Sequence, residues 1–261
     1  MPAMNDPKAM KQQYANADGL QTRMRLHQKY STNKQPYGEW IAEHYRIQPA
    51  MKVLELGCGT ASMWMEPARW LPAEASLLLT DFSEGMLKTA RKNVPFQPNI
   101  SFAQVDIQQI PYEDSAFDLV IANAMLYHVP ELDRAISEVA RVLKPEGRFI
   151  CATAGDRGMH TWLQQVLGEG ESPTMPFSLQ NGGPALEKHF RCAEMHMRED
   201  GLEVTDVQDL AAYVRSMASF AFVRDWPQDE LIDRLNRQSA DGVIRIPKEY
   251  GLFLCTHPRK G

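Results

Sequence analysis

The residues with the clearest chemical potential lie in VLELGCGTAS, from Val53 to Ser62. This apolar run carries one acid, Glu55, and then breaks at Gly57-Cys58-Gly59. Glycines in a turn after a strand let a ligand approach the backbone closely, because no Cβ stands in the way. A G-x-G pair alone is a weak signal, since any tight turn between a strand and a helix can use it. The third position after the second glycine is Ser62, which departs from the G-x-G-x-x-G pattern of dinucleotide-binding loops.

Two further acids stand at the ends of apolar runs. Asp81 ends SLLLTDF, 24 residues after Gly57 (81 minus 57), close to the offset of roughly 20 residues expected of a ribose-binding carboxylate. Asp106 ends a later run, where it could accept a hydrogen bond from an adenine amine while Ile107 offers an apolar edge. Asp106 also fits a simple turn cap, and Glu55 also fits a buried carboxylate with a structural role. The pattern predicts a nucleoside site at the carboxyl ends of parallel strands.

The elements that must position these residues form a regular alternation. Five short apolar runs have the composition of strands: MKVLEL, SLLLTDF, ISFAQVDI, FDLVIANAM and GRFICATA. Between them, SEGMLKTARKNV and LDRAISEVARVLK have helical spacing, with Ser83 as N-cap of the first and Pro145-Glu146-Gly147 ending the second. Strands that alternate with helices predict an α/β domain with a parallel, doubly wound sheet over roughly residues 50–155.

The flanking segments have a looser pattern. PYGEWIAEHYRI predicts a helix that begins near Pro36. Beyond Gly155 the sequence predicts a short helix, a Gly/Pro/Ser-rich loop, a strand at RCAEMHMRE, a helix at DVQDLAAYVRSMASFAF and a closing strand at EYGLFLCTHP. We therefore expect an N-terminal segment over 1–48, a core over 49–155, and cap elements with the final two strands of the same domain over 156–261.

Composition restricts the class of protein. Of the 261 residues 44% are hydrophobic and 23% charged, as in an ordinary globular chain. The net charge of -5 and the absence of any Lys/Arg run longer than two weigh against nucleic acid as a partner. The four cysteines lie far apart, which favours a reduced, cytoplasmic protein without a disulfide or a metal site. No apolar run has membrane-spanning length, so we expect no membrane partner.

Several motifs together resemble one known family. VLELGCGTA, the Asp81 that follows, VDIQQIPYEDSAFDLVIANAMLYHVP and LDRAISEVARVLKPEGRFI are similar to the class I S-adenosylmethionine-dependent methyltransferases, above all to the branch that acts on small molecules. The resemblance covers residues 50–155 closely and EYGLFLCTHP more loosely. It implies S-adenosylmethionine as cofactor. It also implies a Rossmann-like sheet of seven strands with the last strand antiparallel, an N-terminal helical lid and an inserted helical cap.

The resemblance also implies which residues hold the methionine end of the cofactor. In such proteins the glycine loop and the residues after the fourth strand contact this end, and a helix before the first strand acts as a lid. Glu55 would reach the ammonium group through water or backbone. The positions in this chain that match these roles are Tyr30, Glu55, Gly57, Cys58, Gly59, Asn123 and Ala124. For Cys58 we expect a small filler rather than a nucleophile, and Tyr30 also fits simple packing of the lid.

The resemblance also implies which residues hold the nucleoside end of the cofactor. Asp81 would accept hydrogen bonds from the ribose hydroxyls, with Phe82 and Met86 flanking the nucleoside. Asp106 and Ile107 would frame the adenine.

Methyl transfer from a sulfonium is an in-line displacement, so the protein mainly orients the acceptor and excludes water. A general base is needed only if the acceptor loses a proton. His128, in NAMLYHVP, is the candidate base, and Tyr127 a candidate lining residue of the acceptor pocket. His128 also fits a packing role. Cap residues that could shape the acceptor cavity are Trp162, Phe177, Asn181, His196 and Tyr213.

The predicted function is methyl transfer to a small-molecule N, O or C nucleophile by a monomer or homodimer, with the acceptor left open. Arsenite methylation would need a thiolate cluster from Cys58, Cys151 and Cys192. A nucleic-acid methyltransferase that acts on amino groups would carry an NPPY-like motif where this chain has NAML. A fold relative that only binds S-adenosylmethionine, without turnover, is the non-enzyme alternative.

Overall fold

A computed structural model describes residues 17–168 and 175–260, which form two compact units. Unit 1 comprises Met1–Lys34, Gly155–Met175 and Arg198–Tyr250 as far as these are described. Unit 2 comprises Gln35–Ala154, Pro176–Met197 and Gly251–Gly261 in the same sense. Two long strands, β6 and β8, have residues in both units.

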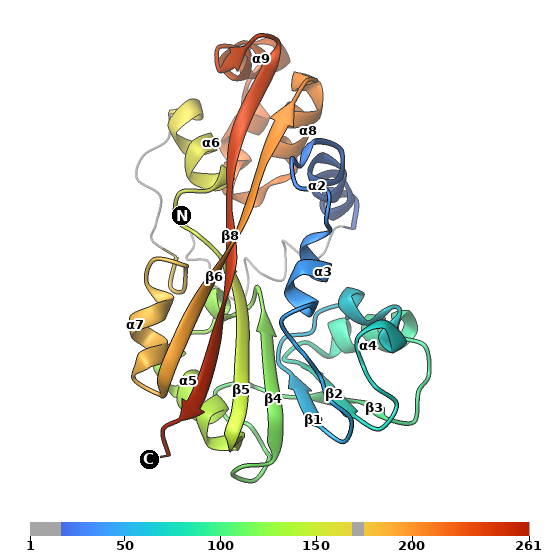
Figure 1. Ribbon diagram of the computed structural model, residues 1–261. Coiled ribbons are helices and arrows are strands. Elements are labelled where there is room, and N and C mark those ends of the chain that lie inside the picture. The colour runs from blue at the N-terminus through green and yellow to red at the C-terminus, as the bar shows by residue number, and fades with distance from the viewer. Residues whose placement is uncertain (1–16, 169–174, 261) are drawn as a thin grey trace. The chain divides into compact units, whose positions relative to one another are not determined.

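The main sheet has the strand order β3-β2-β1-β4-β5-β8-β6, and a short β7 pairs with β8. Its first five strands pair in parallel, whereas β8 runs opposite to β4 (Figure 1). The strands are β1 (Lys52–Glu55), β2 (Ser76–Asp81), β3 (Ile100–Gln104), β4 (Phe117–Asn123), β5 (Leu143–Ala154), β6 (Phe190–Val204), β7 (Ser239–Ala240) and β8 (Val243–Pro258). The predicted Rossmann-like sheet with an antiparallel last strand is confirmed, with β7 as an addition.

The helices fill the connections between these strands. The described α-helices are α2 (Ala17–Tyr30), α3 (Tyr37–Ala42), α4 (Glu84–Asn93), α5 (Leu132–Val142), α6 (Met159–Leu167), α7 (Gly182–Glu187), α8 (Val207–Ser216) and α9 (Gln228–Asn236). Four short 3-10 segments accompany them: η1 (Ser62–Trp64), η2 (Pro67–Arg69), η3 (Leu126–His128) and η4 (Ala218–Asp225).

Local sequence signals predicted several element ends. Ser83 is the N-cap of α4, and its hydroxyl accepts a hydrogen bond from the Met86 N–H at 3.4 Å. The helix expected to continue to Lys144 is shorter, because Leu143 already has extended backbone and begins β5. The helix expected over 206–222 ends at Ser216, after which the chain continues as η4.

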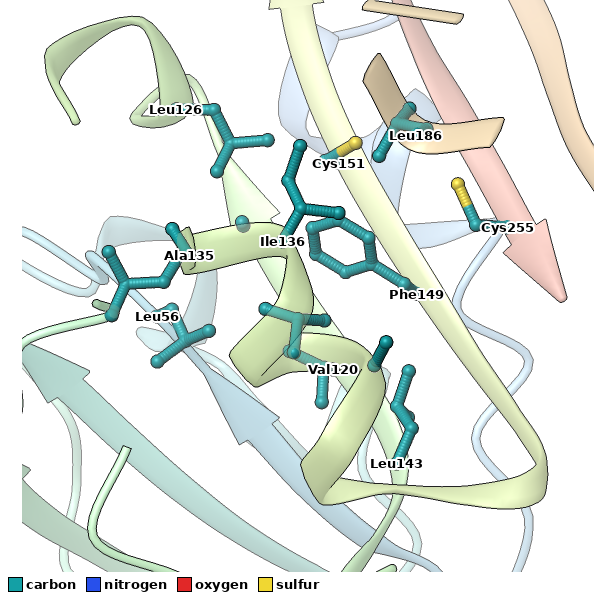
Figure 2. Close-up of a cluster of buried hydrophobic side chains, with 14 of the residues drawn as sticks. Leu56, Val120, Leu126, Ala135, Ile136, Leu143, Phe149, Cys151, Leu186 and Cys255 are labelled. Atoms are coloured by element: carbon teal, nitrogen blue, oxygen red, sulfur yellow. The ribbon is translucent and has the colours of Figure 1, made fainter. Parts of the chain in front are cut away.

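Along the central strands of unit 2, successive side chains point to opposite faces of the sheet, and each face has its own hydrophobic core. Side chains of one face, such as Leu54, Val120 and Phe149, pack under α5 and α7. Those of the other face, such as Val53 and Leu119, pack with α3 and α4. Figure 2 shows the first of these cores, with Phe149 beside the α5 side chains. Because both faces are covered, ligands can reach the strands only at their ends.

Unit 1 has a hydrophobic core of its own. It is built from α2, α6, α8, α9, η4 and residues of β6 and β8, with α8 packed against both α2 and α9. None of the described helices is long and apolar enough to cross a membrane.

Candidate functional site

The glycine loop turns sharply after β1. Gly57 and Gly59 have φ angles of +67° and +56°, in the left-handed region where a side chain is strained. A Cβ on Gly57 would lie 2.9 Å from the Met125 side chain, so this glycine allows close packing. A Cβ on Gly59 would meet no heavy atom of the described residues within 4 Å. The loop therefore presents an open backbone face at Gly59, where a ligand can lie directly on the chain.

Asp81 holds this loop against the end of β2. Its Oδ2 accepts a hydrogen bond from the Gly59 N–H at 2.9 Å, and its Oδ1 accepts one from the Ser83 N–H at 2.8 Å. The Cys58 N–H donates to the Thr80 carbonyl at 2.8 Å. Each carboxylate oxygen has a second lone pair, and Asp81 is only half-buried. Asp81, the residue predicted to bind the ribose, is thus in direct contact with the predicted glycine loop.

Glu55 lies at the base of the loop and is buried, with 3% of its surface exposed. The Trp64 Nε1–H donates to its Oε2, and the Asn123 Nδ2 donates to its Oε1 at 3.3 Å. The same amide nitrogen donates to the Tyr45 hydroxyl oxygen at 2.7 Å. Burial raises the pKa of Glu55 to about 7, although the bonds from Trp64 and Asn123 act in the opposite direction. Near neutral pH this carboxyl is therefore poised between its protonated and ionised forms.

Asn123 brings an unused acceptor to the same edge of the sheet. Its Oδ1 is buried and has no hydrogen-bond partner among the described residues. Leaving a buried acceptor without a donor is unfavourable. Together with the Glu55 carboxylate this oxygen fits a ligand that donates hydrogen bonds and carries positive charge, as an ammonium group does. Ala124 follows at φ +52°, and its N–H donates to the Ala152 carbonyl at 2.9 Å.

The residues expected at the nucleoside end differ in how they are placed. Phe82 directly follows Asp81 and is 71% exposed, while Met86 is half-buried on the first turn of α4. Asp106 accepts hydrogen bonds from the Gln108 N–H at 2.8 Å and from the Gln108 side chain, so it caps the turn after β3. Ile107 is buried in the core cluster beneath α5. The contacts of Asp106 and Ile107 with adenine stay predictions.

The two catalytic candidates lie together on η3, directly after β4. The rings of Tyr127 and His128 are 4.4 Å apart and inclined at 63°. The His128 N–H donates to the Met125 carbonyl at 2.9 Å. Since the Met125 side chain also packs against Gly57, η3 is tied to the glycine loop.

Tyr30 belongs to unit 1, whereas the other predicted site residues, which lie between Glu55 and His128, belong to unit 2. It is buried, and its hydroxyl donates to Asp209 Oδ2 at 2.7 Å, an oxygen that also pairs with Lys29. Burial raises the pKa of Tyr30. The structure thus gives Tyr30 the packing role of joining α2 to α8, and its contact with the methionine moiety stays a prediction.

The five expected cap residues are divided between the units. Trp162 and Tyr213 lie in unit 1, and Phe177, Asn181 and His196 lie in unit 2.

Trp64 and Tyr45 are site residues that the sequence pattern did not reveal. Both are buried, and their rings stack at 6.0 Å between centroids with an interplanar angle of 17°. The signal that could have indicated them is Glu55 itself, because a carboxylate in a buried strand needs nearby donors. The segment after the loop forms the 3-10 helices η1 and η2, and Trp64 lies on the first of them.

The cysteines are placed in different environments. Burial raises the pKa of the Cys58 thiol, which keeps it protonated, as expected of a filler. Cys151 is buried in the core, whereas Cys192 is exposed. Among the described residues no group of three His, Cys, Asp or Glu side chains could hold a metal ion.

Residues 54–151 match a family described as "Methyltransferase domain", and this segment contains the glycine loop, Asp81, Asp106 and Asn123. Residues 54–151 are a class I S-adenosylmethionine-dependent methyltransferase domain.

Individual relatives of this methyltransferase domain come from several organisms. The chain is 33% identical over 120 residues to a demethylmenaquinone methyltransferase of Symbiobacterium thermophilum, covering 44% of this chain and 47% of the relative. It is 33% identical over 182 residues to the methyltransferase GfsG of Streptomyces halstedii, covering 68% and 62%. The chain spans about half the length of the curated relatives it matches.

Among solved structures the chain is similar to a Haemonchus contortus phosphoethanolamine N-methyltransferase 2 in complex with S-adenosyl-L-methionine. The TM-score is 0.60 at 15% identity, and the match covers 99% of this chain and 61% of the other. At that identity the similarity shows the fold.

The raised pKa of Glu55 predicts a pH-dependent stability that Glu55→Gln removes. Because the pKa rises from 4.5 to about 7 on folding, the folded state binds this proton more tightly than the unfolded state. Stability from this group therefore falls as pH rises from about 4.5 to about 7, by roughly 3 kcal/mol, and is constant above. Urea unfolding between pH 4 and pH 8 measures this effect as the difference in the free energy of unfolding between the wild type and Glu55→Gln.

The matched control is Glu113→Gln, which changes an exposed loop acid and should leave the pH profile of the wild type in place. If the difference in the free energy of unfolding between the wild type and Glu55→Gln does not change with pH, the raised pKa of Glu55 is contradicted.

Proposed function

We propose that this protein transfers the methyl group of S-adenosylmethionine to a small-molecule N, O or C nucleophile. The observation that carries the proposal is the open backbone face at Gly59, whose N–H is bound by Asp81 at the carboxyl edge of the sheet. It lies within the segment that matches the methyltransferase domain. The name of one relative, a demethylmenaquinone methyltransferase, supports a small molecule as acceptor.

The methionine end of the cofactor fits the side of the loop that faces β4. Glu55 and the Asn123 Oδ1, which has no hydrogen-bond partner in the described part of the chain, would offer two oxygens to the ammonium group. Gly59 allows the cofactor to lie against the backbone, with Cys58 as a small neutral filler and Gly57 packed on Met125. The exposed Ala124 continues this edge beneath the carboxyl and sulfonium groups.

The nucleoside end fits the side of the loop that faces β2. Asp81 keeps lone pairs for the two ribose hydroxyls while it holds the Gly59 and Ser83 N–H groups. The exposed ring of Phe82 and the half-buried Met86 offer apolar surface to the base. The Val105 N–H donates to the Asp81 carbonyl at 3.2 Å, which brings Asp106 and Ile107 to the neighbouring strand end.

The bound cofactor supplies a methyl group on a positively charged sulfur, which is already an activated leaving group. The chain's own residues orient the acceptor atom in line with that bond and exclude water. Where the acceptor must lose a proton, His128 on η3 is the candidate base, because histidine is the side chain most often used for proton transfer near neutral pH. Tyr127, whose ring contacts His128, is the candidate lining residue beside it.

The remaining layout of the chain is part of the same proposal. We infer a lid over residues 1–48, a cofactor-binding core over 49–155, and a cap with the last two strands over 156–261; residues 1–16, 169–174 and 261 of these ranges lie outside the described residues. The sequence NAML after β4 and the net charge of -5 favour a small-molecule acceptor over a nucleic acid. The separate environments of Cys151 and Cys192 argue against arsenite as acceptor.

Replacing Asp81 should weaken cofactor binding. Asp81→Asn keeps one acceptor oxygen but removes the charge, so we expect S-adenosylmethionine affinity to fall about tenfold or more, that is by about 1.4 kcal/mol. Asp81→Ala, which also releases the Gly59 N–H, should lose more. Isothermal titration calorimetry measures both.

Asp118→Asn is the control for these variants. Asp118 lies at the start of β4, where it accepts hydrogen bonds from the Lys52 N–H and from Lys144, away from the carboxyl edge. We expect it to bind the cofactor as the wild type does. Wild-type affinity in both Asp81 variants would refute the site.

His128→Ala separates catalysis from binding. If His128 is the base, turnover falls on the order of 100-fold while cofactor affinity is unchanged. Labelled S-adenosylmethionine incubated with metabolite pools measures turnover, and calorimetry measures binding. Full turnover in the variant assigns His128 to packing. Retained cofactor without methylated product in the wild type, across broad pools, would instead support a non-catalytic binding protein.

A further inference from the structure

Trp64 brings a hydrogen-bond donor to Glu55 from the segment after the glycine loop. Its side chain is fully buried, and its Nε1–H donates to Glu55 Oε2. An indole N–H can only donate, and such a bond is stronger to an ionised carboxylate than to a protonated carboxyl. The contact therefore favours the ionised form of Glu55.

The Trp64 ring is held in place from two sides. The Ala61 N–H donates to the Cys58 carbonyl at 2.9 Å, and the Trp64 N–H donates to the Ala61 carbonyl at 2.9 Å. On its other side the ring stacks on Tyr45, with 6.0 Å between the ring centroids. Two successive backbone hydrogen bonds thus join the donor of Glu55 to the glycine loop itself.

The other groups that face Glu55 do less to keep it ionised. The Asn123 amide donates to Oε1 at 3.3 Å and lowers the pKa of Glu55 less than Trp64 does. The charge of Asp81, on β2, raises that pKa. Tyr45 and Cys58 are titratable, but burial raises the pKa of both, so they are neutral near pH 7. Trp64 is therefore the main group that opposes protonation of Glu55.

We propose that Trp64 is a positioning residue of the cofactor site, whose indole N–H keeps the Glu55 carboxylate ionised and in place for the ammonium group of S-adenosylmethionine. This role rests on the proposed contact between Glu55 and the cofactor. A protonated Glu55 offers no charge to a cation, so the proton must leave before the two can pair. Trp64 thus sets the lower limit of the pH range in which the cofactor binds well. It acts through Glu55 and needs no contact with the cofactor.

Trp64→Phe tests this role, because it keeps an aromatic ring beside Tyr45 but removes the donor. Calorimetric titration with S-adenosylmethionine between pH 5.5 and pH 7.5 measures the affinity. Without the donor the pKa of Glu55 should rise further. A rise of one unit from about 7 would weaken binding about tenfold at pH 6 but only about threefold at pH 7.5.

Two control variants separate this effect from a loosened structure. Tyr45→Phe removes a hydroxyl that accepts from Asn123 but has no printed bond to Glu55, so any loss of affinity should be the same at every pH. Trp70→Phe makes the same exchange at the residue after η2 and should bind as the wild type does. A loss in Trp64→Phe that does not depend on pH, or the same pH dependence in Tyr45→Phe, overturns the proposal.

Urea unfolding without cofactor measures the contact between Trp64 and Glu55 independently. In the wild type the stability from Glu55 falls as pH rises and becomes constant near pH 7. In Trp64→Phe the folded-state pKa is higher, so the fall should continue above pH 7. An unchanged profile also overturns the proposal. The extended fall together with no cofactor binding by the wild type would instead refute the proposed function and leave the role of Trp64 toward Glu55 in place.

Discussion

The site depends on the hydrogen bonds that the carboxylate of Glu55, buried at the end of β1, accepts from other elements. A buried charge is stable only where donors from other elements converge on it. Here Trp64 comes from η1 and Asn123 from the end of β4. The glycine loop follows β1 directly, and Asp81 fixes the loop from the end of β2. Glu55 thus joins the ends of β1 and β4, and Asp81 adds the end of β2.

Most of the fold of unit 2 follows from local patterns. Alternating strands and helices predicted the parallel sheet, and Ser83 correctly predicted the start of α4, because periodicity and capping are properties of neighbouring residues. The early start of β5 was missed, since Leu143 pairs with Phe117, a contact that no local pattern contains. The same spacing also left two roles open for Asp106, and the structure shows its bonds to Gln108.

What the sequence pattern could not supply are pairings between distant residues. Trp64 was not singled out because its hydrogen bond depends on how η1 folds back onto β1. Tyr30 and Asp209 are 179 residues apart, so α2 and α8 gave no sign that they belong to one unit. The buried ion pairs of Arg198 and Lys248 with Asp200 are hidden for the same reason, because each residue alone resembles a solvated charge on a strand.

We propose that Glu55 faces the ammonium group of S-adenosylmethionine, and the number of protons released on binding measures this contact. Without ligand, burial raises the pKa of Glu55 to about 7. A cation beside Glu55 stabilises the ionised form and therefore lowers this pKa, so binding releases a proton. Calorimetric titrations with S-adenosylmethionine near pH 6, in buffers of different ionisation enthalpy, count the protons. We expect release of close to one proton by the wild type and none by Glu55→Gln. Equal proton counts for the two proteins would contradict it.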